Sequence, residues 1–166
     1  MNHIMNMNLD EALGNVECVY SDIVAIANDM VGGIVADVNA LIEEASNNIE
    51  SLTNDEIRAL MLKVSFKAFS LGETKEKSAF KAECAKIVRD EAYATKFNGT
   101  EGKVDERKNA TTLQISQEIV VNALYELTAD LLKTKLDGCY RVVDALKTVL
   151  MSRANDAKLS SLSAGE

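Results

Sequence analysis

The sequence has no proline and no tryptophan, and its 166 residues include a single histidine. Because proline ends or kinks helices, its absence leaves nothing to interrupt very long ones. The histidine, His3, is remote in sequence from all three cysteines, so no histidine-based triad or structural zinc site is expected. Phosphate-loop, dinucleotide-binding, zinc-protease, EF-hand and paired-cysteine motifs are also missing. The sequence therefore predicts a protein that is not an enzyme and that holds no metal and no cofactor.

Positive charge is missing from the first third of the chain. Residues 1–57 contain no lysine or arginine, whereas residues 58–166 contain all 18 of them. The acidic residues of the first segment are Asp10, Glu11, Glu17, Asp22, Asp29, Asp37, Glu43, Glu44, Glu50, Asp55 and Glu56. We divide the chain accordingly into an acidic N-terminal helical arm, 1–57, and a helical hairpin region, 58–166, within one structural unit. The arm is expected either to pack against a basic partner, in the same chain or in another copy, or to be a solvated helix surface.

Long apolar runs and closely spaced cysteines are missing as well. The longest apolar stretches, such as residues 23–27, are far shorter than the about 20 residues that cross a bilayer. The N-terminus also lacks the basic and apolar regions of a signal peptide. The cysteines Cys18, Cys84 and Cys139 are each embedded in an apolar helical stretch, where reduced core residues are expected. These features predict a soluble cytoplasmic protein without membrane contact.

Apolar residues recur every three or four positions over most of the chain and predict helices. The first helix is expected to begin near Asn8 or Asp10. Its expected apolar stripe is Val16, Val19, Ile23, Ile26, Met30, Ile34, Val38, Leu41, Ala45 and Leu52. The adjacent glycines at 32–33 interrupt this helix at a cost of roughly 1 kcal/mol each relative to alanine. They indicate either a kink or a close approach by another helix.

Three further helices are expected. Thr53 and Glu56 are spaced as a capping box, which predicts that the second helix begins there and ends at Leu71-Gly72. The third is a charged helix over residues 73–97. Residues 98–109 have the composition of a hinge or mobile loop. The fourth helix is expected to run without a break from about residue 110 to about residue 158.

The last helix contains a strict heptad seam. Its members are Leu132, Leu136, Cys139, Val143, Leu146 and Leu150. Alternating steps of four and three predict left-handed coiled-coil packing with a partner helix. The predicted fold class is all-α, an elongated antiparallel helical bundle with a long coiled-coil hairpin. Because one narrow stripe leaves a thin core, we expect self-association into a homo-oligomer.

A cluster of cations with two aromatic residues follows in the third helix and the loop after it. Single-stranded nucleic-acid binders combine cations for the backbone with aromatic platforms for the bases. The candidate nucleic-acid-binding residues are Lys75, Lys77, Lys81, Lys86, Arg89, Tyr93, Lys96, Phe97, Lys103, Arg107 and Lys108. The competing interpretation is an ordinary exposed helix, because acidic residues alternate with several of these lysines and suit ion pairs along the helix.

One stretch of the chain resembles a known family. The segments AKIVRDEAYATKFNGTEGKVDERKNA and RVVDALKTVLMSRANDAK, within residues 75–158, are similar to small helical proteins of tailed bacteriophages, the recombination mediators of the UvsY type. The resemblance implies an oligomeric helical protein that helps to load a recombinase onto single-stranded DNA in the host cytoplasm. The acidic arm lies outside the resemblance, and the formal net charge of −8 departs from a DNA-binding mediator.

Two functional hypotheses follow. The first is a non-enzymatic phage accessory protein of DNA recombination or replication, which contacts single-stranded DNA, a recombinase or a single-strand-binding protein. The second is a protein-binding module. It would serve as an adaptor, an assembly scaffold, or an inhibitor whose acidic arm mimics nucleic acid and occupies a basic groove of a host protein.

Overall fold

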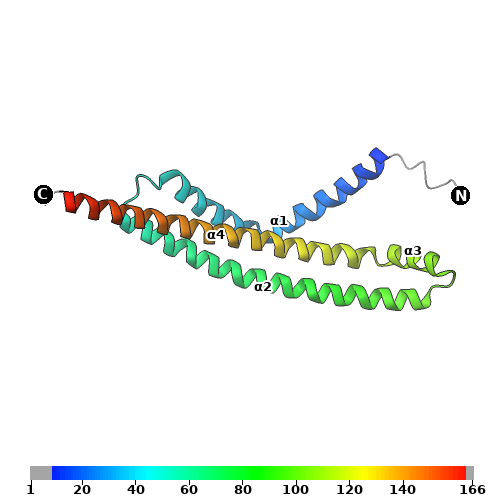
Figure 1. Ribbon diagram of the computed structural model, residues 1–166. Helices are drawn as coiled ribbons and strands as arrows, with labels where there is room; N and C mark the ends of the chain where they lie inside the picture. The colour runs from blue at the N-terminus through cyan, green and yellow to red at the C-terminus, as the bar shows by residue number, and fades with distance from the viewer. Residues whose placement is uncertain (1–8, 164–166) are drawn as a thin grey trace. The chain divides into compact units, whose positions relative to one another are not determined.

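The computed structural model describes residues 9–163, with side chains from Glu17 onward. The described residues form helices without any strand, so the predicted all-α class is confirmed (Figure 1). The elements are α1 (Leu9–Asn48), α2 (Asn54–Gly99), α3 (Val104–Gln114) and α4 (Ser116–Ser163).

The helices divide between two compact units. Unit 1 combines residues up to Val31 with Lys77–Ala129, and unit 2 combines Gly32–Glu76 with residues from Asp130 onward. The three long helices α1, α2 and α4 therefore each contribute one part to each unit. Neither unit coincides with the arm or the hairpin region expected from charge alone.

Unit 2 has a core of branched and aliphatic side chains from α1, α2 and α4. Its buried apolar residues are Val38, Ala45, Ile57, Leu60, Val64, Ala68, Leu71, Leu132, Cys139 and Leu146. The predicted seam of α4 faces this core, because Leu132, Cys139 and Leu146 are at most 1% exposed and their alternates Leu136, Val143 and Leu150 are half-buried. Left-handed supercoiling of the seam stays a prediction.

The connection between α1 and α2 is fixed at both ends by polar side chains. The predicted capping box is confirmed, because the Thr53 N–H donates to Glu56 Oε2 at 2.7 Å and the Glu56 N–H donates to Thr53 Oγ1 at 3.3 Å. From α4, the half-buried Arg153 guanidinium donates to the carbonyl oxygens of Leu52 at 2.6 Å and Ile49 at 3.0 Å. It also donates to the Glu50 carbonyl at 3.2 Å. Arg153 thereby attaches the inter-helix turn to α4.

Unit 1 has a core of a different kind. Its buried residues are Ala27, Val31, Ser78, Ala82, Thr111, Ile115, Asn122 and Thr128. Most of these side chains are small or polar, and Thr111 Oγ1 and Asn122 Oδ1 have no hydrogen-bond partner among the described residues. Small side chains supply little apolar area, so burial stabilises this unit less than unit 2.

Three predicted helix boundaries were wrong. Gly72 does not end a helix, because α2 runs unbroken through it and the adjacent Leu71 is fully buried in unit 2. The expected loop at 98–109 is reduced to residues 100–103, because 98–99 end α2 and 104–109 form the first part of α3. The last helix does not run on from residue 110, since the chain leaves helical geometry at Ile115, where φ is −109° and ψ is 22°. Burial of the Ile115 side chain accompanies this break.

The short connection before α3 depends on one glycine. Gly102 has a φ of +119°, a conformation that side-chain-bearing residues rarely adopt. A Cβ at this position would also lie 3.2 Å from Glu106 Oε2. That same oxygen accepts a hydrogen bond from the Lys103 N–H at 3.2 Å, which caps the first turn of α3.

The apolar stripe expected for the first helix was partly wrong. Val38 and Ala45 are buried as expected, but Val19, Ile26 and Met30 are 45–52% exposed, whereas the smaller Ala27 and Val31 are buried. In the N-terminal part of α1 the packed face is therefore rotated away from the largest side chains. At the glycine pair, added Cβ atoms would have nothing within 4 Å, and the helix continues through both residues. Close approach of another helix at these glycines is thus not observed in the described part of the chain.

Part of α1 also has the length and apolar composition of a membrane-crossing helix. Within the described residues, Glu17–Asn48 satisfies both criteria, with a mean hydropathy of 1.4 and 11% of the apolar window buried. Within this segment Val38 is buried in unit 2, and Asp37 is paired with Lys67. The absence of membrane contact stays a prediction.

Candidate functional site

Ten of the eleven candidate nucleic-acid-binding residues lie on α2 and α3, or between them, in unit 1, and Lys75 lies on the part of α2 in unit 2. The structure brings three of them into one stack. The rings of Tyr93 and Phe97 are parallel within 11°, with centroids 5.8 Å apart. On Phe97, the guanidinium carbon of Arg107 lies 4.1 Å from the ring centroid.

The Arg107 side chain is held in this stack by the end of α2. Its Nη2 donates to the Phe97 carbonyl oxygen at 2.6 Å, which ties α3 back to the last turn of α2. Its Nε is buried without a hydrogen-bond partner among the described residues. Tyr93, Phe97 and Arg107 are all half-buried, so the stack is chiefly a structural contact between α2 and α3. Base stacking on Phe97 would need Arg107 to leave its ring.

The other candidate cations fall into two groups. Lys75 pairs with Glu76 at 2.7 Å and Arg89 pairs with Asp90 at 2.8 Å, while Lys81 Nζ lies 5.6 Å from the centroid of the Tyr125 ring. Within the described residues, no ion pair or side-chain hydrogen bond is made by Lys77, Lys86, Lys96, Lys103 or Lys108. These five lysines are the cations that remain free to meet a phosphate backbone.

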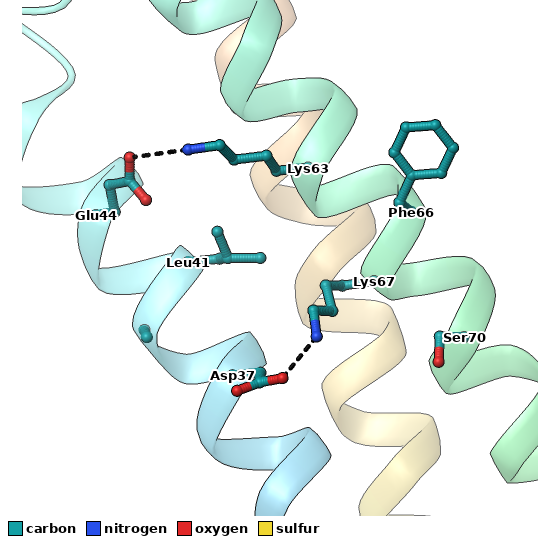
Figure 2. Close-up of a pocket in the computed structure, with 8 residues that line it drawn as sticks. Asp37, Leu41, Glu44, Lys63, Phe66, Lys67 and Ser70 are labelled. Atoms are coloured by element: carbon teal, nitrogen blue, oxygen red, sulfur yellow. Dashed lines mark hydrogen bonds and ion pairs between the residues drawn. The ribbon is translucent and has the colours of Figure 1, made fainter.

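In unit 2, a surface groove runs between α1 and α2 (Figure 2). Two ion pairs cross it: Lys67 Nζ to Asp37 Oδ2 at 2.6 Å, and Lys63 Nζ to Glu44 Oε1 at 3.8 Å. Leu41 lies between the two pairs on the α1 side. The acidic helix thus does meet lysines of the same chain, but at Lys63 and Lys67. Docking of α1 against the basic segment 75–97 stays a prediction.

The outer side of α2 carries large apolar side chains that the sequence interpretation did not single out. Leu62 is 60% exposed, Phe66 is 73% exposed and Phe69 is 71% exposed. Figure 2 shows Phe66 pointing away from α1. Leu62, Phe66 and Phe69, with Ser65, line a shallow hollow on α2. We call Leu62, Phe66 and Phe69 the outer stripe.

The signal for the outer stripe was present in the sequence. Its members are spaced by four and then three residues, which is the spacing of one helix face. The core residues Leu60, Val64 and Leu71 have a similar spacing, so this part of α2 has two apolar faces. Periodicity assigned the helix one stripe and did not show that a second stripe would be left exposed.

Among the described residues, no group of three or more histidine, cysteine, aspartate or glutamate side chains is placed to hold a metal ion. Burial raises the pKa of the Cys139 thiol, and the Thr53 hydroxyl and backbone N–H lower the pKa of Glu56 by hydrogen bonding. Both groups belong to the packing and capping already described. No known protein family, curated protein or solved structure matches the chain.

Proposed function

We propose that this chain is a non-enzymatic helical adaptor that binds an amphipathic helix of a partner protein along the outer stripe of α2. The observation that supports this function is the exposure of Leu62, Phe66 and Phe69 on one face of a helix whose opposite face is already packed. Monomeric soluble proteins rarely expose contiguous apolar patches larger than a few hundred Å², and patches of that size mark interaction sites.

The occupant follows from the shape and spacing of the stripe. Side chains at steps of three and four on a straight helix match apolar residues at the same steps on another helix. Aromatic anchors such as Phe66 and Phe69 contribute most when a partner excludes water from them. The hollow beside Ser65 receives one apolar side chain of the partner.

Selection from a displayed library of amphipathic helical peptides tests the proposal. We expect the selected peptides to carry apolar residues at steps of three and four. Their affinity should fall about tenfold or more for the double variant Phe66→Ser, Phe69→Ser. Leu159→Ser is the matched control, because Leu159 is 65% exposed on α4 outside the outer stripe. Peptides that bind the double variant as well as the original chain would contradict the proposed function.

A second candidate function is contact with single-stranded DNA in phage recombination, as the resemblance to mediators of the UvsY type suggests. It is favoured by one observation: the free lysines Lys96, Lys103 and Lys108 lie in sequence around the Tyr93, Phe97 and Arg107 stack. Fluorescence anisotropy of a labelled oligothymidine at low salt tests it. Binding should weaken with added salt. It should also be lost when these three lysines are changed to glutamine, while Lys158→Gln has no effect. Absence of binding at low salt would remove this candidate.

A further inference from the structure

Unit 1 leaves two apolar surfaces of the same chain uncovered. The first is on α1, where Val19, Ile26 and Met30 are 52%, 50% and 45% exposed. Their spacing of seven and four residues places them on one side of the helix. The second is a groove of about 480 Å³ between α2 and α4, whose lining includes Val88 and Val121. These two valines are 56% and 45% exposed.

Aspartates flank the α1 surface, and lysines lie on the α2 side of the groove. Asp22 and Asp29 follow Val19 and Ile26 by three residues each, and within the described residues neither makes an ion pair or a side-chain hydrogen bond. Lys81 lines the groove, where its Nζ lies 5.6 Å from the centroid of the Tyr125 ring. Lys77, four residues before it, makes no ion pair or side-chain hydrogen bond in the described part of the chain. Glu118 lines the α4 side of the groove, so an apolar helix with acidic flanks complements the groove in charge on its α2 side, where the two lysines lie.

In unit 2, the second half of α1 shows how an apolar helix with acidic flanks packs against α2. There α1 packs against α2 in the antiparallel direction, with Asp37 opposite Lys67 and Glu44 opposite Lys63. Asp37 and Glu44 are seven residues apart, so they share one face of α1. This register places two lysines of α2 along the edge of a buried helix contact.

The lysines of this pattern recur two heptads away in α2, whereas the matching positions of α1 are apolar. Fourteen residues before Asp37 and Glu44 in α1 are Ile23 and Met30, each directly preceded by an aspartate. Fourteen residues after Lys67 and Lys63 in α2 are Lys81 and Lys77. Continuing the register of unit 2 would place Ile23 beside Lys81 and Met30 beside Lys77. This spacing suits a second contact between α1 and α2.

We propose that the groove between α2 and α4 in unit 1 binds the α1 segment 17–31 of a second copy of the chain, in the antiparallel register that unit 2 uses. In a single chain the segment and the groove are both uncovered, although Ala27 and Val31 of the same segment are buried. Exchange of the segment between two copies covers both surfaces twice and closes a two-fold dimer.

The glycines at 32–33 lie directly after the exchanged segment, so bending there lets the segment, with Ala27 and Val31, move into the groove of the other copy. A Cβ at either position would have no neighbour within 4 Å, so these glycines are not needed for packing. They weaken α1 at the end of the exchanged segment, because each lowers helix stability by roughly 1 kcal/mol relative to alanine. Bending α1 at this point disrupts no other contact of the two residues. The exchange does not involve the outer stripe, so it stands apart from the proposed adaptor function.

Light-scattering mass during gel filtration tests the dimer at tens of micromolar protein. We expect twice the mass of the 18.1 kDa chain for the unmodified protein. Val19→Glu in the segment and Val121→Glu in the groove should each weaken the dimer about tenfold to a hundredfold. Both sites are exposed in the single chain, so circular dichroism should show an unchanged helix content. Leu159→Glu and Phe66→Ser are matched controls outside the two surfaces, and both should leave the mass unchanged.

Mixing the two variants gives a sharper result. A dimer of one Val19→Glu chain and one Val121→Glu chain keeps one intact segment bound in one intact groove. The mixture should therefore regain mass that neither variant shows alone. A monomeric mass for the unmodified protein, or a mixture no heavier than its parts, would overturn the exchange and leave closure of the segment on its own groove.

A disulfide provides a second readout that does not depend on dimer strength. Cys84 is exposed and lines the groove, and the register places it near residues 20–23 of the bound segment. In a Cys18→Ser background, Ile23→Cys should form a disulfide with Cys84 of the other copy under mild oxidation. The product would have double mass on a non-reducing gel and would vanish when Cys84→Ser is added. A disulfide confined to single chains would contradict the second copy as occupant.

Discussion

Removal of the Arg153 side chain should destabilise unit 2 by a predictable amount. Its guanidinium makes part-buried hydrogen bonds to the Leu52 and Ile49 carbonyls, at 2.6 and 3.0 Å. A more exposed hydrogen bond goes to the Glu50 carbonyl. Hydrogen bonds to a charged group contribute about 1.5–3 kcal/mol each when desolvated. Because Arg153 is half-buried, we discount that sum and expect Arg153→Ala to cost about 2 kcal/mol. For a chain of this size the melting temperature should fall by about 4–8 °C.

Thermal unfolding followed by circular dichroism measures this loss. Arg141→Ala is the matched control, because Arg141 is exposed on the same helix and forms no ion pair or side-chain hydrogen bond within the described residues. Arg153→Lys keeps the charge but loses the planar fork, so it should recover only part of the lost stability. If Arg153→Ala lowers the melting temperature no more than Arg141→Ala, the turn is not held by this side chain.

Three further outcomes are expected. Leu146→Ala should lower the free energy of unfolding by about 2–5 kcal/mol in urea titrations, because Leu146 is fully buried in the seam; a smaller effect would mean that the seam collapses around the change. Removing the Asp37 and Lys67 side chains in a double-mutant cycle should give a coupling below about 1 kcal/mol, since both are substantially exposed. The pKa of Glu56 is lowered in the folded state, so its stabilising effect is present at neutral pH and is lost as the pH falls through the folded-state pKa. The difference in urea midpoint between Glu56→Gln and the original chain should accordingly disappear in acid.

The features predicted correctly from sequence are those fixed by residues close together in the chain. The capping box at Thr53 and Glu56 needs only the spacing of two side chains and a following helix. Heptad spacing also marked Leu132, Cys139 and Leu146 as one packed face, and these side chains are buried, whereas their coiled-coil packing stays a prediction. Both signals are local, so no knowledge of the neighbouring helices was required.

The features predicted wrongly depend on contacts between distant segments. The break at Ile115 has no glycine or proline to mark it, and it coincides with burial of that side chain in unit 1. In α1, periodicity favoured the larger Ile26 and Met30, whereas the packed face uses the smaller Ala27 and Val31. Apolar spacing shows that α1 has two apolar faces but does not show which of them is packed. The choice is made by the helices that pack against it.

The contrast between the two cores implies that the two halves of α4 differ in how readily they unfold locally. In α4, the amides near Leu132 and Leu146 lie over tightly packed aliphatic residues, whereas those near Asn122 lie over small and polar ones. Amide hydrogens of the first group should exchange with deuterium only when the whole chain unfolds. Those of the second group should exchange through local unfolding, which has a lower free energy. Protection along α4 should therefore rise from its first half to its second half, although the backbone hydrogen bonds of the helix are of one kind throughout.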